Sequence, residues 1–395
     1  MTDVLISGAG VAGSALAWWL RHHGFRPTVV ERAPSPRDGG YKVDVRGAAL
    51  TVLERMGLAG RVRAHDTGMR LARFLDDRGR QLATMDAALF GGRSTGDVEV
   101  MRGDLTRLLR ADDVEHRFGD SITALDADAG GVDVTFARGD RRRYDLVVGA
   151  DGLHSTVRRL AFGPGSVHLR PLGHHIAVCT VPAGLAEDRV ELLHPEPGRT
   201  VGVYRTAGAP DARALFLFRS PAGDTDAGDL AGRRDVLTGA FAGAGWRVPE
   251  LLAAAADAPD LYLDAMSQVV MPSWSSGRVG LVGDAAYAAS PASGQGTSLG
   301  LVGAYVLAAA LAEAAGRPAD GFAAYERRMR PFVDANQALA QRNLKGMVLG
   351  STGQIRFQTA MLRLLPHLPG RERMVGRVAE PIRRAATAIT LPDAA

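Results

Sequence analysis

The 395-residue sequence predicts an α/β protein in which a doubly wound α/β domain is interrupted by an antiparallel sheet and followed by C-terminal helices. Three observations lead to this fold class. Glycine-centred segments at 8–13, 149–152 and 283–284 each follow a short apolar run, as at the strand ends of α/β domains. Apolar and polar residues alternate in several runs between 166 and 270, which is typical of antiparallel strands. From Phe322 onward the apolar spacing is helical almost to the end.

Composition indicates a globular protein with a substantial core, because 46% of the residues are hydrophobic and 23% are charged. The net charge is only +4, and Lys42 and Lys345 are the only lysines, so we expect no nucleic-acid partner. The single cysteine, Cys179, excludes an internal disulfide and a multi-cysteine metal site, and we expect no bound metal. The N-terminus lacks a basic signal-peptide region, which favours a cytoplasmic protein. The uncharged segment Thr297–Ala312 predicts a buried helix rather than a membrane span.

The N-terminal half predicts a βαβ unit followed by mixed elements. Val4–Ser7 and Pro27–Glu31 are expected strands, and the helix Ala12–His23 between them ends at Gly24. Further on, the same reasoning predicts a helix ended by Gly57, a hairpin turning at Asp77-Arg78-Gly79, a second helix and more strands. Their expected ranges are Ala48–Met56, Met69–Asp86, Asp104–Arg110, Ile122–Phe136 and Tyr144–Val148.

In the C-terminal half, alternation predicts three strands at His175–Val181, Thr200–Arg205 and Ala214–Phe218. Parallel-sheet character resumes at Arg278–Asp284. The helical pattern from Phe322 has interruptions at Gly350, Pro366 and Pro369. The run Arg141-Arg142-Arg143 is interpreted as a solvated strand end.

The first glycine motif has the spacing of a dinucleotide-binding loop of the Rossmann type. Gly8 permits a tight turn, Gly10 lets the backbone approach a pyrophosphate, and Gly13 lets the helix lie close to the strand. The phosphates would sit at the helix N-terminus. Glu31 ends the second strand, where an acidic residue accepts hydrogen bonds from a ribose 2′-OH and disfavours a 2′-phosphate, so FAD or NAD is expected rather than NADP. The expected ligands here are Gly8, Gly10, Val11, Ala12, Gly13, Glu31 and Arg32.

Two later motifs bear on which dinucleotide, FAD or NAD, is bound. In Gly149-Ala150-Asp151-Gly152 a strand ends in a carboxylate, with Ser155 and Arg158 at fixed offsets; the alternative is an ordinary helix capped by Asp151. In the third, Asp284 ends a strand and can accept from a ribityl hydroxyl. The glycines that follow have no side chain to cover the backbone, so backbone N–H groups can face an electron-rich ring edge. The expected cofactor contacts are Asp151, Gly152, Arg158, Gly283, Asp284, Pro291, Gly294, Gln295, Gly296 and Thr297.

The ordered set of motifs resembles the class A FAD-dependent monooxygenases, which have the para-hydroxybenzoate-hydroxylase-like fold. Gly39–Asp44 and Val100–Leu105 further resemble the branch that hydroxylates aromatic polyketides and inactivates tetracyclines. The resemblance implies that Asp44 and Arg102 contact FAD, that Arg37 serves NADPH, and that the mid-chain motif serves both FAD and NAD(P)H. Tyr287 and Ser298 depart from the histidine and asparagine common in the family.

The resemblance also implies a domain plan. An FAD-binding domain would comprise 1–68, 97–165 and 273–330. A substrate domain would comprise the hairpin at 69–96 and the sheet at 166–272, and the C-terminal helices would occupy 331–395. The candidates to line a substrate cavity are Tyr204, Arg205, Phe216 and Phe218. Strand alternation does not decide which of these side chains face inward.

The implied activity is hydroxylation of an aromatic or polycyclic, polyketide-like small molecule with non-covalent FAD, NADPH or NADH, and O2, through a flavin C4a-hydroperoxide. No side chain is needed as a nucleophile, so no catalytic residue is assigned. Baeyer–Villiger oxidation, epoxidation or another oxidative chemistry on this fold, and a non-catalytic flavin- or ligand-binding protein, are open alternatives. No membrane partner is expected, the chain would be a monomer or homodimer, and its role would lie in antibiotic biosynthesis or resistance.

Overall fold

The computed structural model describes residues 1–36, 39–164, 167–220, 229–369 and 371–393. Its first sheet has the strand order β17-β18-β11-β1-β2-β7, in which β18, β11, β1, β2 and β7 are parallel neighbours. The strands span Asp3–Ser7 (β1), Arg26–Glu31 (β2), Glu115–Phe118 (β7), Leu146–Gly149 (β11), Ser275–Ser276 (β17) and Val279–Leu281 (β18). The predicted βαβ unit is confirmed.

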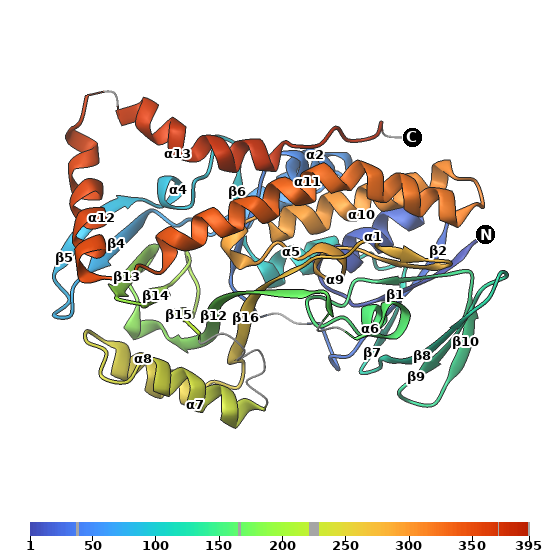
Figure 1. Cartoon of the computed structure of the whole chain (residues 1–395), viewed down its shortest axis with the longest axis horizontal. Helices are drawn as coiled ribbons and strands as arrows, with labels where there is room; N and C mark the ends of the chain where they lie inside the picture. The colour runs from blue at the N-terminus through green and yellow to red at the C-terminus, as the bar shows by residue number, and fades with distance from the viewer. Residues whose placement is uncertain (37–38, 165–166, 221–228, 370, 394–395) are drawn as a thin grey trace.

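Helices cover one side of this sheet and a small antiparallel sheet lies on the other (Figure 1). α1 packs against both α5 and α10. The helices are α1 (Val11–His22), α2 (Ala48–Arg55), α3 (Ala59–Ala64), α5 (Arg102–Leu109), α6 (Thr156–Phe162), α9 (Asp284–Tyr287) and α10 (Gly296–Glu313). The small sheet contains β8 (Ile122–Ala127), β9 (Val132–Phe136) and β10 (Arg141–Tyr144). The three arginines of β10 are exposed, as predicted, and Arg142 and Arg143 form ion pairs.

The uncharged C-terminal segment of this domain forms α10, which is long and apolar enough to cross a membrane. However, 78% of its residues are buried inside the protein. Apolar residues are buried around its whole circumference because α1, α2 and α11 pack against it. A helix that is apolar all round and enclosed in this way belongs to a protein core, which confirms the interpretation made from the sequence.

The second sheet has the order β16-β12-β15-β14-β13-β4-β5. Its strands are β4 (Leu71–Leu75), β5 (Gln81–Asp86), β12 (Leu169–Pro182), β13 (Val190–Glu196), β14 (Arg199–Tyr204), β15 (Asp211–Arg219) and β16 (Tyr262–Val269). The expected hairpin is confirmed as β4–β5, and it joins the later strands through parallel pairing of β4 with β13. The η2 turn (Ala183–Leu185) and helix α4 (Ala87–Phe90) lie in connections of this sheet.

Three elements, α7, α8 and β3, were not expected from the sequence. Residues 166–270 also form α7 (Leu230–Ala240) and α8 (Val248–Asp257), whose buried Val248, Leu251 and Ala255 show helical spacing within an alanine-rich run. Part of the Gly39–Asp44 segment, to which the sequence analysis assigned no element, forms a strand, β3 (Lys42–Val45), paired antiparallel with β6 (Val98–Met101). Pairing supplies hydrogen bonds to backbone groups that a buried loop would leave unsatisfied.

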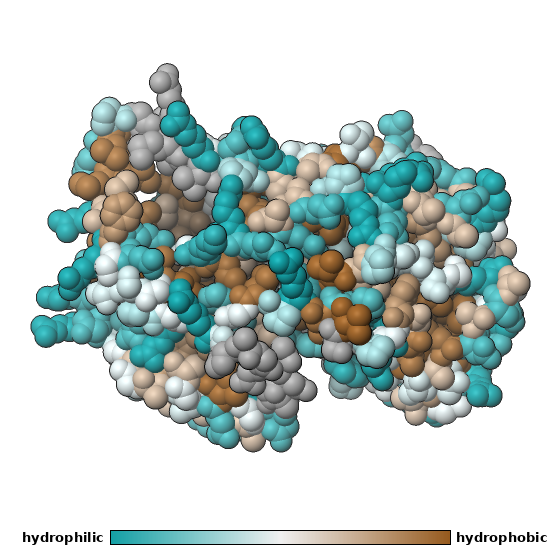
Figure 2. Space-filling view, in the orientation of Figure 1, coloured by the Kyte–Doolittle hydropathy of each residue, from teal (hydrophilic) through white to brown (hydrophobic). Residues whose placement is uncertain are grey.

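The C-terminal helices are α11 (Pro318–Met347), α12 (Thr352–Leu364) and α13 (Arg371–Ala386), with turns η3 (Pro291–Ser293) and η4 (Leu365–His367). α11 runs unbroken across the expected domain limit at 330/331, and Figure 1 shows it extending from the first domain towards the second sheet. α12 exposes Phe357, Met361 and Leu364, and Figure 2 shows apolar side chains gathered over it at the left of the view.

Candidate functional site

The three glycine motifs meet at one edge of the first sheet, because β1, β11 and β18 are parallel neighbours. A Cβ added to Gly8, whose φ is +106°, would lie 2.6 Å from the carbonyl oxygen of Ala150 in the second motif. One added to Gly283 would lie 2.8 Å from the Cβ of Ala12. The glycines therefore permit the close approach that brings the segments together at the carboxyl ends of the strands, where α/β folds bind ligands.

Within the first motif, Gly10 differs from its neighbours. A Cβ on Gly13 would lie 1.9 Å from the carbonyl oxygen of Gly8, so the fold itself requires glycine there. A Cβ on Gly10 would meet nothing within 4 Å, and Gly10 is exposed at the start of α1. The free space lies where free N–H groups of a helix N-terminus favour an anion, with Val11 and Ala12 in the first turn.

Glu31 lies beside this loop. Its carboxylate accepts hydrogen bonds from the backbone N–H groups of Ala9 (3.0 Å) and Ala33 (2.9 Å). These bonds hold the carboxylate between the first loop and the end of β2, as a ribose-binding residue requires. Arg32, the next residue, is exposed. Arg37 lies outside the described residues.

The second motif caps helix α6. Asp151 accepts from the hydroxyl of Ser155 and from the N–H groups of Thr156 (2.8 Å) and Val157 (3.1 Å), and burial raises its pKa. The helix-cap alternative is therefore what the geometry shows, and any contact of Asp151 or Gly152 with a cofactor is additional to it. The cap fixes the direction of the loop at Gly152.

Arg158 supports this motif from behind. Its side chain is only 1% exposed and donates to the carbonyl oxygens of Ala285 (2.9 Å) and Leu153 (2.6 Å). Burial lowers its pKa, partly offset by Asp151. The prediction that Arg158 contacts a cofactor is corrected, since it joins the second motif to α9 without reaching the surface of the cleft.

The third motif presents exposed residues between buried neighbours, and the surface that these residues share with Gly10 and Arg102 is here called the cleft. Asp284, Pro291, Gly294 and Gly296 are exposed, although almost all other residues from 279 to 300 are buried, and Thr297 is half-buried. The carboxylate of Asp284 lies about 4 Å from where a Cβ of Gly296 would be, beside the N-terminus of α10. Gln295 is different, because the whole residue is buried, its backbone N–H donates to the Ser293 hydroxyl (3.1 Å) and its carbonyl oxygen accepts from Leu299 (2.9 Å), so it does not reach the cleft.

Arg102 and Tyr41 complete the wall of this cleft opposite Asp284. The Arg102 N–H donates to the carbonyl oxygen of Tyr41 (3.1 Å), and its guanidinium lies 5.4 Å from the centre of the Tyr41 ring. Asp284 is accessible through the cleft yet surrounded by protein, so burial raises its pKa while Arg102 lowers it. Burial, together with Asp284, raises the pKa of Tyr41. Sequence reasoning missed Tyr41, although an aromatic residue directly after Gly39-Gly40 marked the position.

Asp44 has protein partners instead of an open face. Its carboxylate pairs with Arg46 (2.6 Å) and Arg93 (3.5 Å). Arg93 also pairs with Glu99, and Glu99 joins Lys42, which in turn pairs with Glu191 at 2.7 Å. The backbone N–H of Arg46 donates to Ser298 of α10. Asp44 thus belongs to a largely buried charge cluster that ties the β3–β6 ribbon to β13 of the second sheet.

The substrate candidates separate onto two faces of the second sheet. Tyr204 faces the cofactor domain, and its hydroxyl accepts from the N–H of Lys42 (3.0 Å). Phe216 and Phe218 instead contact Phe241 in the core beneath α7 and α8, so their assignment to the cavity is corrected. Arg205 pairs with Asp188 and, by alternation, faces away from Tyr204.

Cys179 lies in the same core beneath α7 and α8, and burial raises the pKa of its thiol to about 12, which makes it a poor nucleophile.

The opposite face of this sheet is aliphatic. It is buried, because Ile176, Val178, Leu217 and Met266 form a core cluster with Ala292 of η3 and with Ala340, Leu344 and Val348 at the end of α11. Half-buried apolar side chains, Tyr41, Leu172 and Leu215, pack at the edge of this cluster. This face therefore adjoins the cleft wall directly.

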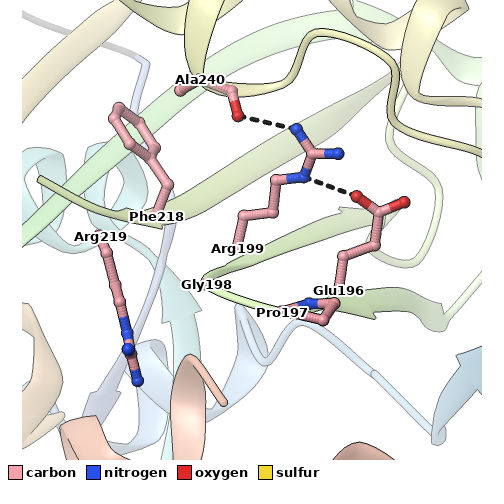
Figure 3. Close-up of a pocket in the computed structure, with 7 residues that line it drawn as sticks. All are labelled: Glu196, Pro197, Gly198, Arg199, Phe218, Arg219 and Ala240. Carbon is pink, nitrogen blue, oxygen red and sulfur yellow. Dashed lines mark hydrogen bonds and ion pairs between the residues drawn. The ribbon is translucent and has the colours of Figure 1, made fainter. Parts of the chain in front are cut away.

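A separate pocket of about 250 Å³ lies at the hairpin between β13 and β14, lined by Glu196, Pro197, Gly198, Arg199, Phe218, Arg219 and Ala240 (Figure 3). Arg199 donates to the carboxylate of Glu196 and to the carbonyl oxygen of Ala240. These polar groups satisfy one another, and none belongs to the three motifs. This pocket is therefore not the cleft.

The cleft residues fit FAD. Gly10 leaves room for a pyrophosphate at the start of α1, Glu31 stands at the ribose position, and Asp284 faces Arg102 where a ribityl chain would run. The exposed backbone of Gly296 at the start of α10 offers an N–H group to a ring edge, whereas the N–H of Gly294 donates to the carbonyl oxygen of Pro291 (3.0 Å).

Comparison with known proteins agrees with this geometry. The family model described as FAD binding domain matches residues 1–340. An uncharacterized protein of Mycobacterium tuberculosis is 44% identical over 351 residues, covering 88% of this chain and 94% of its own. A flavin-dependent monooxygenase of Legionella longbeachae is 38% identical over 336 residues, covering 85% and 86%. The crystal structure of the tetracycline destructase Tet(51) matches with a TM-score of 0.88 and 30% identity over 100% of both chains. The chain thus belongs to the FAD binding domain family and is a flavin-dependent monooxygenase related to the tetracycline destructases.

Proposed function

We propose that this monooxygenase uses NAD(P)H and O2 to hydroxylate an aromatic or polycyclic small molecule. One observation carries the proposal: half-buried apolar side chains, those of Tyr41, Leu172 and Leu215, border the aliphatic cluster of the second sheet beside the cleft wall. An apolar surface beside a flavin-binding cleft suits a flat, largely apolar substrate. The similarity to Tet(51), a tetracycline destructase, supports a polycyclic substrate class.

The residues assigned to FAD follow from the cleft. The first glycine loop and the α1 N-terminus would hold the pyrophosphate, and Glu31 the ribose. Asp284 and Arg102 would hold the ribityl chain, and the backbone of residues 288–297, here called the flavin-edge loop, would hold the ring edge. When bound, FAD supplies hydride acceptance from NAD(P)H and the activation of O2.

The protein's own contribution is orientation and exclusion of water. The N-terminus of α10 presents free N–H groups towards the ring edge and favours negative charge there. The half-buried Tyr41, Leu172 and Leu215 at the border of the aliphatic cluster would orient the substrate's rings against that edge and keep water out. Tyr204 lies on the same face but is only 2% exposed, and its hydroxyl accepts from the N–H of Lys42, so we assign it to the support of the sheet and not to substrate contact.

We infer that the enzyme binds a small-molecule substrate and no macromolecular partner, that it is cytoplasmic, and that it is a monomer or a homodimer. The buried position of α10 supports the absence of a membrane partner.

The experiment that tests the function is stopped-flow reduction of the bound flavin by NADPH, and separately by NADH, with a panel of polycyclic phenols. Reduction that accelerates with one compound, followed by an oxygen-dependent product 16 Da heavier, would support the proposal. The mass change alone does not separate hydroxylation from Baeyer–Villiger oxidation or epoxidation, so the product's structure would be determined by NMR. A protein that binds FAD and is never reduced by either nicotinamide would contradict the proposal and favour a ligand-binding role.

A further inference from the structure

A set of side-chain amides contacts the flavin-edge loop on the side that faces α11 and β16. Gln337 of α11 donates through Nε2 to the carbonyl oxygens of Val269 (2.8 Å) and Ala288 (3.3 Å). Asn343, almost two turns further along α11, donates to the carbonyl oxygen of Ala292 (3.1 Å). These amides therefore contact both ends of the segment that leads into η3.

Gln268, at the end of β16, adds a third contact. Its Nε2 donates to the carbonyl oxygens of Gln337 (2.7 Å) and Ala289 (3.4 Å), and its side chain is 1% exposed. The backbone N–H of Val269 also donates to the carbonyl oxygen of Ala288 (3.0 Å). Three carbonyl groups of the loop, those of Ala288, Ala289 and Ala292, thus point towards α11 and β16.

This arrangement bears on the cleft because it holds the turn that precedes the exposed Gly294 and Gly296. The N–H of Ser293, which follows the Ala292 carbonyl, donates to the carbonyl oxygen of Ser290 (3.0 Å), so the amides hold η3 and with it the direction in which the chain enters α10. The loop needs such support, since Ser290 has a φ of +76°, a left-handed conformation that is strained for a residue with a side chain. Strain of this kind persists only where the surrounding structure holds it.

We propose that Gln337 and Asn343 of α11, with Gln268 of β16, are positioning residues that set the orientation of the flavin-edge loop and thereby tune FAD affinity and reduction potential. The inference rests on the proposed placement of FAD against this loop. α11 is also bonded to the second sheet at its far end, where the Thr200 hydroxyl donates to the carbonyl oxygen of Met347 (2.9 Å). The helix thus connects the substrate-side sheet to the flavin edge.

The test uses the full-length chain carrying Gln337→Met and Asn343→Leu, which keep side-chain volume and remove the donors. The matched control is Gln358→Met on α12, which loses an amide bond to the carbonyl oxygen of Gly346 (3.3 Å), outside the loop. We expect FAD to bind about tenfold more weakly to the double variant, as a loss of roughly 1.4 kcal/mol would give. We also expect its midpoint potential to become more negative, because the loop no longer holds the N-terminus of α10 against the ring edge.

Wild-type affinity and potential in a folded double variant would overturn the inference, and so would equal shifts in the Gln358→Met control. If the double variant does not fold, the single Asn343→Leu variant at the half-buried end of the set decides by the same two measurements. A wild-type protein that binds no FAD would instead refute the proposed function, so the two failures are distinguishable.

Discussion

Replacing Asp284 by asparagine should weaken FAD binding while it stabilises the protein without FAD. The side chain stands at the start of α9, faces Arg102 and lies beside the α10 N-terminus. A carboxylate that accepts from a ribityl hydroxyl makes a charge-assisted hydrogen bond, and such bonds contribute about 1.5–3 kcal/mol. The dissociation constant should therefore rise between roughly tenfold and a hundredfold, at 1.4 kcal/mol per factor of ten.

The stability effect has the opposite sign. Burial raises the pKa of Asp284 above its ordinary value, and Arg102 offsets this only in part. The folded protein therefore holds the proton more tightly than the unfolded chain, so its stability falls as the pH rises from the ordinary pKa through the raised one. At neutral pH the charged carboxylate is the less stable form, and the uncharged Asp284→Asn side chain should raise the Tm of the FAD-free protein.

Two measurements check this pair of expectations: quenching of flavin fluorescence on titrating FAD-free protein, and thermal unfolding of the same preparation between pH 4 and 8. Asp334→Asn, at an exposed position of α11, is the matched control. An Asp284→Asn variant that purifies with full flavin occupancy and an unchanged dissociation constant would refute the assignment of Asp284 to the cofactor. A lowered Tm without FAD would refute the electrostatic reasoning.

Three further predictions concern other residues. Arg102→Ala should weaken FAD binding about tenfold or more, and an unchanged dissociation constant in fluorescence titration would contradict its place in the cleft. Gly10→Val should fold with a wild-type Tm yet bind FAD poorly, because the valine side chain has room in the protein but occupies the pyrophosphate position. Gly13→Val should fail to fold, because its side chain would meet the backbone of Gly8. Equal behaviour of the two variants in thermal unfolding and FAD titration would count against this account. Lys42→Met should destabilise the protein by about 3–5 kcal/mol in urea unfolding, because it leaves the buried Glu99 and Glu191 short of a positive partner. Adding Glu191→Gln should recover part of that loss, and no recovery would argue against the ion-pair cluster.

The sequence predicted the FAD-binding half of the molecule well because local rules govern it. Gly8 and Gly13 are required by backbone contacts within one strand–turn–helix, and such contacts leave a fixed spacing in the chain. The buried helix α10 was equally evident from its uncharged run and its position after a glycine motif. The ranges of β1, α1 and β2 differ from expectation by only a residue or so at each end.

Side-chain direction was harder to predict. Phe216 and Phe218 alternate with Leu215 and Leu217 along β15, and apolar residues occupy both faces because α7 and α8 cover one face and η3 with the end of α11 covers the other. A strand buried on both faces gives no periodic signal of which side faces the ligand. The helices themselves went unrecognised in an alanine-rich stretch.

The sequence by itself thus determined the family, the cofactor and the backbone of its binding loops, since these depend on residues adjacent in the chain. Only the tertiary structure showed that Arg158 lies behind the cleft, that Asp44 is paired with Arg46 and Arg93, and that amides of α11 hold the flavin-edge loop. Those roles depend on contacts between residues up to 127 positions apart, as between Arg158 and Ala285. No spacing in one sequence records such a contact, because many residue pairs could form it and only the packed fold selects one.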